Sequence, residues 1–244
     1  MNRFNFFVKK QMIRIMLCII MILILVLVRR QTDSEIEFLS GFFQWFNERK
    51  FLAIYVTLYL ISLFGQLKLI YDADRVIRNT DIWNHLSFIW KEIGVNAIIF
   101  AFLSTAGWYV IVGTAIKDCM NYRNIIYMCL IFFTQNIGWI EIGILATFIY
   151  SIVRNSPFTY ILCHTTLILL NLSLYITNSE KFVQYSRIYY FMYELRQLNN
   201  WFTVISVAFL HIAIIFLLVF STYSVVKKHD FISGDKNAYA QRRE

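Results

Sequence analysis

Long apolar runs separated by short polar segments make up most of the chain. Apolar runs of about 18 residues or more recur, and each is long enough to cross the hydrocarbon layer of a membrane, which is about 30 Å thick. Runs such as MLCIIMILILVLV are apolar on every side, whereas the strands of a membrane β-barrel alternate in polarity. The pattern therefore predicts an all-α, polytopic membrane protein. Six transmembrane helices are expected at about 12–28, 51–71, 94–113, 125–153, 158–177 and 201–226.

Two of these spans carry an additional feature. The fourth has about 29 residues, or roughly 43 Å of helix, so we expect it to be tilted or interrupted near Gly138. The first follows the basic and aromatic leader MNRFNFFVKKQ, which is typical of a short helix at the membrane surface. A signal peptide is the alternative for this region, but no small-residue cleavage site follows, so we expect an uncleaved span.

The segment between the second and third spans, DADRVIRNTDIWNHLSFIWKE at 72–92, is more patterned than a simple connection requires. Its apolar residues recur at helical spacing, and two tryptophans, Trp83 and Trp90, flank that face. The face consists of Ile82, Leu86, Ile89 and Ile93, and the candidate N-caps before it are Asn79, Thr80 and Asp81. The sequence predicts a short interfacial helix at about 80–92. Either a lipid anchor or a docking surface for a partner fits this pattern.

Charge decides the expected orientation. The chain is 59% hydrophobic, has a mean hydropathy of +0.57 and carries a net charge of +8. If the N-terminus is inside, the inner segments hold 14 of the 23 Lys and Arg residues. Short loops rich in these residues stay in the cytoplasm, so both termini are expected there. This distribution explains the basic character without a nucleic-acid partner.

The remaining composition indicates one membrane domain over residues 1–244, with no catalytic or metal site expected. The four cysteines, Cys18, Cys119, Cys129 and Cys163, form no CxxC pair, which argues against a zinc site or a disulfide framework. The sequence contains no HExxH, GxSxG or phosphate-loop lysine motif and no pair of intramembrane aspartates. An intramembrane enzyme stays open as an alternative, because polar residues from different spans can converge.

Few polar residues fall inside the predicted spans. The candidates for a substrate path are Gln135, Asn136, Glu141 and His211. Ionisable groups at this depth normally face protein or water, so Glu141 either lines a path or accepts a proton, or else forms a hydrogen bond between helices. Both readings also stay open for His211. An ordinary interhelical hydrogen bond is expected for His164.

Two further patterns concern packing and the outer surface. Ala97, Ala101 and Thr105 form a ridge of small residues, which suits an internal contact or a dimer seam. The loop before the last span is rich in aromatic residues and is expected to lie at the outer surface. Its candidates for an outer gate or a substrate contact are Tyr185, Tyr189 and Tyr190. A passive aromatic belt is the alternative.

Three stretches carry a family resemblance. They are RNTDIWNHLSFIWKEIGVNAIIFAF, IGWIEIGILATFIYSIVRNSPFTYILCHTTLILL and VVKKHDF. Together with the six-span layout, they resemble the permease subunits of type 2 ABC exporters, in particular the small bacterial permeases of peptide and bacteriocin export or immunity systems. Arg78, Asn79, Thr80 and Trp83 match the pattern of the family. Asp81 stands where a basic residue is common, and Asn84 replaces a second tryptophan.

The resemblance implies a mechanism and a set of partners. The helix at 80–92 becomes a coupling helix that docks on a separate cytoplasmic ATPase, which binds ATP and Mg²⁺, so this chain needs no cofactor. A second permease copy or a related chain completes the assembly in the plasma membrane of a bacterium. A hydrophobic or cationic peptide is the expected cargo, and a non-transporting immunity or sensor protein is the alternative. The residues expected to contact the ATPase are Arg75, Arg78, Asn79, Thr80, Asp81, Trp83, Leu86 and Trp90.

Overall fold

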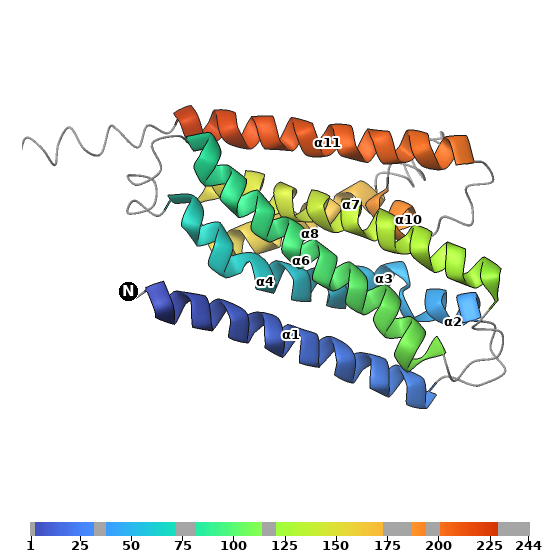
Figure 1. The fold of residues 1–244 in the computed structure, drawn as a ribbon. Coiled ribbons are helices and arrows are strands. Elements are labelled where there is room, and N and C mark those ends of the chain that lie inside the picture. The colour runs from blue at the N-terminus through green and yellow to red at the C-terminus, as the bar shows by residue number, and fades with distance from the viewer. Residues whose placement is uncertain are drawn as a thin grey trace, which may run out of the picture.

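The computed structural model is an elongated bundle of helices (Figure 1) and describes six ranges of the chain. These ranges are 3–31, 38–71, 82–113, 121–172, 187–193 and 201–228. Within them, four helices are long and apolar enough to cross a membrane. They are α1 (Arg3–Gln31), α6 (Ile82–Ile111), α7 (Tyr122–Val153) and α11 (Trp201–Lys228). The chain therefore has the character of a helical membrane protein.

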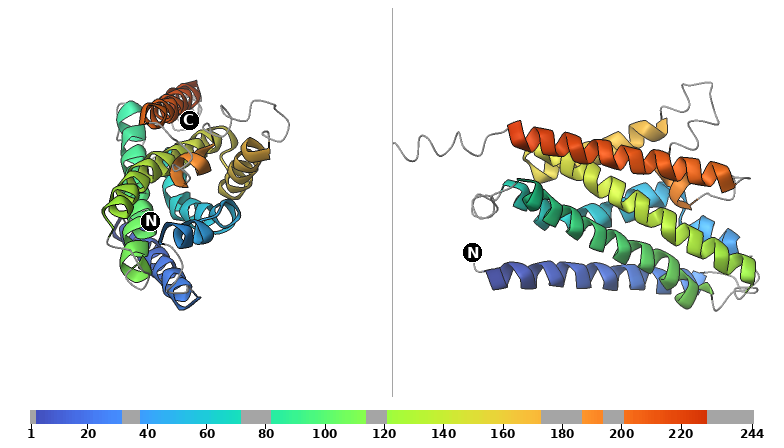
Figure 2. Two further views of the ribbon diagram at one scale, coloured as in Figure 1. Left: turned by 90° about the vertical axis from the view of Figure 1, so that its right-hand side faces the viewer. Right: turned by 45° about the horizontal axis from the view of Figure 1, so that its top comes forward.

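Helix α7 lies at the centre of the bundle. Both α6 and α11 pack along it, and α1 packs against the other side of α6 (Figures 1 and 2). The small-residue ridge on α6 explains part of this close packing, because Ala97, Ala101 and Thr105 are buried. Of the two alternatives for this ridge, the structure therefore favours an internal contact.

The second and fifth predicted spans are also helical over the residues that the structure describes. The second is a continuous helical run made of α3 (Glu48–Lys50), the π-helix η1 (Phe51–Val56), α4 (Thr57–Leu67) and the 3₁₀-helix η2 (Lys68–Tyr71). The fifth is α8 (Ser156–Leu172), which follows α7 after a tight turn. Arg154 closes α7 in the left-handed region at φ 57°, and the side chain of Asn155 accepts a hydrogen bond from the backbone of Phe158.

Two expectations about helix boundaries differ from the structure. The leader does not form a separate surface helix, since α1 runs without a break from Arg3 into the first span. The coupling helix expected at 80–92 and the span expected from residue 94 are one helix, α6, because the helical period continues across Gly94. For α7, one of the two expected alternatives is excluded, because the helix is uninterrupted at Gly138.

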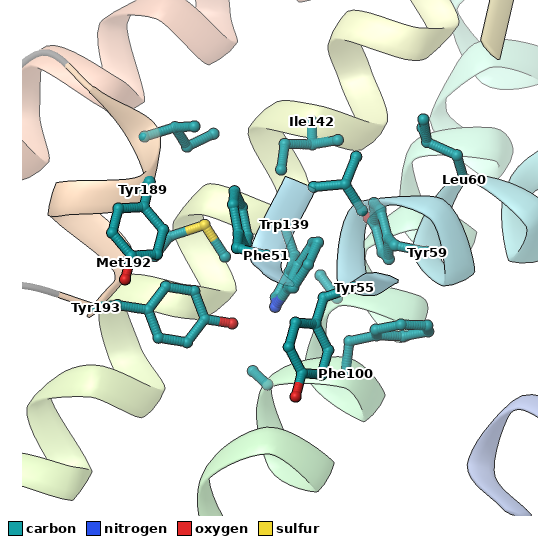
Figure 3. Close-up of a cluster of buried hydrophobic side chains, with 14 of the residues drawn as sticks. Phe51, Tyr55, Tyr59, Leu60, Phe100, Trp139, Ile142, Tyr189, Met192 and Tyr193 are labelled. Atoms are coloured by element: carbon teal, nitrogen blue, oxygen red, sulfur yellow. The ribbon is translucent and has the colours of Figure 1, made fainter. Parts of the chain in front are cut away.

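Two short helices, α2 (Phe38–Trp45) and α10 (Ile188–Tyr193), insert aromatic side chains into the core near one end of the bundle. Figure 3 shows Tyr189, Met192 and Tyr193 of α10 directed towards Trp139 of α7 and Phe51 of η1. The absence of a side chain at Gly138 admits α10, because an added Cβ would lie 2.4 Å from Sδ of Met192. Helix α10 is thus part of the core.

The beginning of α1, the beginning of α6 and the end of α11 all lie at the opposite end of the bundle (Figures 1 and 2). The side chain of His85 on α6 lies 3.3 Å from the carbonyl oxygen of Ile70 in η2. This contact brings the end of η2 next to the beginning of α6.

Candidate functional site

Trp83 lies in an exposed aromatic cluster that joins the beginning of α6 to the end of α11. Its ring centroid lies 5.2 Å from that of Trp90, 5.6 Å from that of Tyr223 and 6.3 Å from that of Phe220. Trp83 is 41% exposed despite these contacts. Nζ of Lys227 lies 5.7 Å from the centroid of the Tyr223 ring, which places a cation beside the cluster. We call Trp83, Trp90, Phe220 and Tyr223 the aromatic clamp.

The predicted apolar face of this helix points into the bundle. Leu86 is 0% exposed, and Ile89 and Ile93 are also buried. The expectation that Leu86 contacts an ATPase therefore does not fit this structure, because the residue is packed in the core. Trp83 is exposed and Trp90 is half-buried, and both belong to the clamp. The other predicted contact residues, Arg75, Arg78, Asn79, Thr80 and Asp81, lie outside the described residues.

Glu141 of α7 and His211 of α11 form a close pair well inside both helices. Nδ1 of His211 lies 2.6 Å from Oε2 of Glu141. The side chain of His211 is 0% exposed and that of Glu141 is 12% exposed. The ring of Phe191, from α10, stacks on the imidazole with 4.4 Å between centroids and 20° between planes. The two sequence candidates thus meet each other, and α10 covers them.

The second ring nitrogen of His211 is not part of the contact with Glu141. Nε2 is buried and has no hydrogen-bond partner among the described residues. Phe191, which stacks on the ring, belongs to a small buried apolar cluster with Ile137 and Val207. A buried polar atom without a hydrogen-bond partner is costly.

Gln135 and Asn136 do not join this pair. Oε1 of Gln135 accepts a hydrogen bond from Ser104 of α6, while Nδ2 of Asn136 donates to the carbonyl oxygen of Phe132 in its own helix at 2.8 Å. The four predicted path residues therefore do not form one site. Gln135 connects α7 to α6, and Glu141 connects α7 to α11.

A charged pair between α1 and α6 was not predicted. Nη2 of Arg14 in α1 lies 2.7 Å from Oε2 of Glu92 in α6, and Nε of Arg14 donates to Oδ1 of Asn96 at 2.8 Å. Nδ2 of Asn96 donates in turn to Ser62 of α4 at 3.5 Å. The available signal was Arg14 near the start of an apolar run, since a charge beside a membrane span favours a partner.

The aromatic candidates of the outer segment have mainly packing contacts. Tyr189 is buried, and its hydroxyl donates to the carbonyl oxygen of Phe46 at 2.6 Å. Tyr190 is half-buried, with the guanidinium of Arg187 5.3 Å from its ring centroid. Tyr185 lies outside the described residues. Tyr189 therefore belongs to the core and does not lie at the surface as expected.

Two other features are a contact of His164 and an apolar groove. His164 forms the expected interhelical contact, with Nε2 3.1 Å from the carbonyl oxygen of Leu52. An apolar groove of about 430 Å³ lies between α6 and α7 and includes Phe102, Val110 and Phe132. Within the described ranges, no three His, Cys, Asp or Glu residues are grouped so that they could hold a metal ion.

Comparison with known proteins identifies no relative of the chain. No protein-family model, curated protein or solved structure matches the chain significantly.

Proposed function

We propose that the chain is the transmembrane subunit of an ATP-driven exporter of the type 2 ABC class, and that it moves a hydrophobic or cationic peptide out of a bacterial cell or its membrane. The observation that supports this proposal best is the aromatic clamp. It combines an exposed tryptophan, at the start of a long apolar helix, with a firm connection to a second such helix. The resemblance of this region to the coupling helix of the family gives the clamp its proposed role.

The packing suggests how a force applied at Trp83 would reach the membrane. Helix α6 is continuous from Ile82 to Ile111, so its inner end cannot move without its membrane part. The contacts of Trp83 with Phe220 and Tyr223 would make the end of α11 move together with α6. Both helices pack along α7. Docking and release of a partner would therefore shift α6 and α11 together against α7, as a rigid-body change between two states.

The proposed topology has six spans with both ends in the cytoplasm. The run from Glu48 to Tyr71 and helix α8 would be the two shorter spans beside the four long helices. Lys227 and Lys228 end α11 on the side where the aromatic clamp lies, which agrees with the excess of Lys and Arg on the cytoplasmic side. The clamp would then face the compartment that contains ATP.

The sequence indicates which subunit of the proposed transporter would bind ATP. Because the chain contains no phosphate-loop motif, ATP and Mg²⁺ would bind only to the ATPase partner. A second permease chain would complete the transporter. The alternative of a non-transporting immunity or sensor protein depends on an accessible outer aromatic surface, and the burial of Tyr189 removes one of its expected contacts.

The proposal is tested by co-expressing the full chain with the ABC ATPase encoded in its gene cluster. We expect the two to co-purify, and Trp83→Ala to reduce peptide-stimulated ATP hydrolysis about tenfold or more. Phe209→Ala is the matched control, because Phe209 is a 67% exposed aromatic residue of α11 outside the clamp. A complex that does not form, or equal hydrolysis by the two variants, would contradict the proposal.

A further inference from the structure

The contact between Ser104 and Gln135 brings two polar helix faces together in the core. Ser104 and Trp108 lie one turn apart on α6, as Gln135 and Trp139 do on α7, so each pair shares one face of its helix. The hydroxyl of Ser104 donates to Oε1 of Gln135 and joins these faces. All four side chains are buried. Both tryptophans therefore start within one helical turn of the same contact.

Three nitrogen atoms at this place are hydrogen-bond donors without an acceptor. They are Nε1 of Trp108, Nε2 of Gln135 and Nε1 of Trp139, and each is buried with no partner among the described residues. Indole and amide N–H groups only donate, so the three cannot satisfy one another. Buried unpaired polar groups are rare in folded proteins, and each calls for an explanation. We call these three residues the buried donor cluster.

Aromatic rings connect the members of the cluster. The ring centroid of Phe46 lies 5.9 Å from that of Trp108 and 5.5 Å from that of Tyr193. The centroid of Phe51 lies 5.5 Å from that of Trp139 and 5.4 Å from that of Tyr193. Figure 3 shows the hydroxyl of Tyr193 directed towards the indole of Trp139. The donors are thus surrounded by apolar ring surface.

The backbone beside the cluster is also unusual. Phe51 and Tyr55 project from η1, which is a π-helix, and both side chains are buried. Short π-helical turns are uncommon and occur frequently at functional sites. This feature is independent of the unpaired donors and lies against the same rings.

These observations specify the chemistry of a ligand. A carbonyl oxygen can accept two hydrogen bonds and brings no donor of its own, whereas water would add two further donors to a place already rich in them. The rings would bury the apolar remainder of the molecule. We propose that the buried donor cluster binds the carbonyl group of an apolar ligand, with Trp108, Gln135 and Trp139 as the hydrogen-bond donors.

Access to the cluster involves α10. Met192 and Tyr193 of this short helix are directed towards Trp139 (Figure 3), and they approach α7 closely over Gly138. A ligand therefore enters when α10 moves away from α7. A hydrophobic peptide, the proposed cargo, belongs to this class of ligand, but the binding site does not depend on the transport proposal.

NMR of the full chain in lipid nanodiscs tests the site without any ATPase, so its outcome is separate from that of the transport proposal. The tryptophan indoles are labelled with ¹⁵N, and single Trp→Phe variants assign their signals. The probe is N,N-dimethylbenzamide, which has an aromatic ring and a carbonyl oxygen but no N–H. Isopropylbenzene, an aromatic hydrocarbon of similar size, is the control ligand.

We expect the amide to move the indole proton signals of Trp108 and Trp139 downfield in a saturable manner, and isopropylbenzene not to do so. Trp90 is the internal control, because its Nε1 is also buried and unpaired among the described residues but belongs to the aromatic clamp. Unchanged signals of Trp108 and Trp139, or equal shifts with the hydrocarbon or at Trp90, would overturn the proposal.

A substitution then tests the donor role. Trp139→Phe removes the indole N–H and keeps an aromatic ring, so it should weaken binding of N,N-dimethylbenzamide roughly fivefold, the effect of one net hydrogen bond. Trp90→Phe is the same chemical change outside the cluster and should leave the affinity unchanged. Equal affinities of the wild type and Trp139→Phe would contradict the assignment. If Trp139→Phe does not fold, the titration of the wild-type chain still decides.

Discussion

The packing of α6 and α4 against α7 can be tested at a single glycine. A Cβ added at Gly143 would lie 2.4 Å from Cγ2 of Ile93 and 2.8 Å from the hydroxyl oxygen of Tyr59. Both neighbours are buried, and a β-branched Ile93 has little rotational freedom to move aside. Gly143→Ala should therefore force the helices apart, at a cost of about 1–3 kcal/mol for an overpacked core.

The intrinsic helix preference of alanine acts in the opposite direction. Replacing glycine by alanine inside a helix contributes about 1 kcal/mol, which would partly hide the packing cost. Gly94 provides the matched control, because an added Cβ there meets nothing within 4 Å. Since the helix preference cancels between Gly143→Ala and Gly94→Ala, their difference in unfolding free energy isolates the packing term.

The assay is reversible unfolding of the full chain in bicelles by added SDS. Gly143→Ala should be less stable than Gly94→Ala by about 1–3 kcal/mol. If the two variants agree within about 0.5 kcal/mol, the close approach of α6 and α4 to α7 is not as the structure has it.

Two further predictions use the same unfolding assay. Arg14→Met should destabilise the chain by about 3 kcal/mol, because it leaves the Glu92 carboxylate without its cation, and Arg14→Met with Glu92→Met should recover most of the loss; a double variant no more stable than the single would argue against the ion pair. Tyr189→Phe should cost about 1–3 kcal/mol, since the carbonyl oxygen of Phe46 loses its buried donor, whereas the half-buried Tyr190→Phe should change stability little; similar effects of both would contradict the assigned hydrogen bond.

The long apolar helices could be predicted because their signal is local. The runs that become α1, α7 and α11 are long and predominantly apolar, and the turn at Arg154 lies between two apolar runs, three residues before Pro157. Boundaries within a continuous helix carry no such signal. The amphipathic period of Leu86 and Ile89 continues into the span, so the sequence carries no signal for a boundary near residue 93, and the boundary expected there was wrong.

The pairings between distant residues were not predictable from one sequence. Glu141 and His211 were each recognised as unusual, but their contact depends on how α7 and α11 pack, and no local pattern encodes this. The core position of Tyr189 was missed for a related reason. Aromatic residues suit a membrane surface and a buried core equally well, and only the space above Gly138 decides between them.

The most direct test of the proposed function is site-specific photo-crosslinking in intact cells, with a photoreactive amino acid placed at Trp83 or, as a control, at Phe209. Trp83 lies in the aromatic clamp, and Phe209 is exposed elsewhere on α11. We expect the probe at Trp83 to form an adduct with a cytoplasmic ATPase that mass spectrometry identifies by its phosphate-loop motif, and the probe at Phe209 to form none. Adducts at Trp83 with lipid alone would contradict the account.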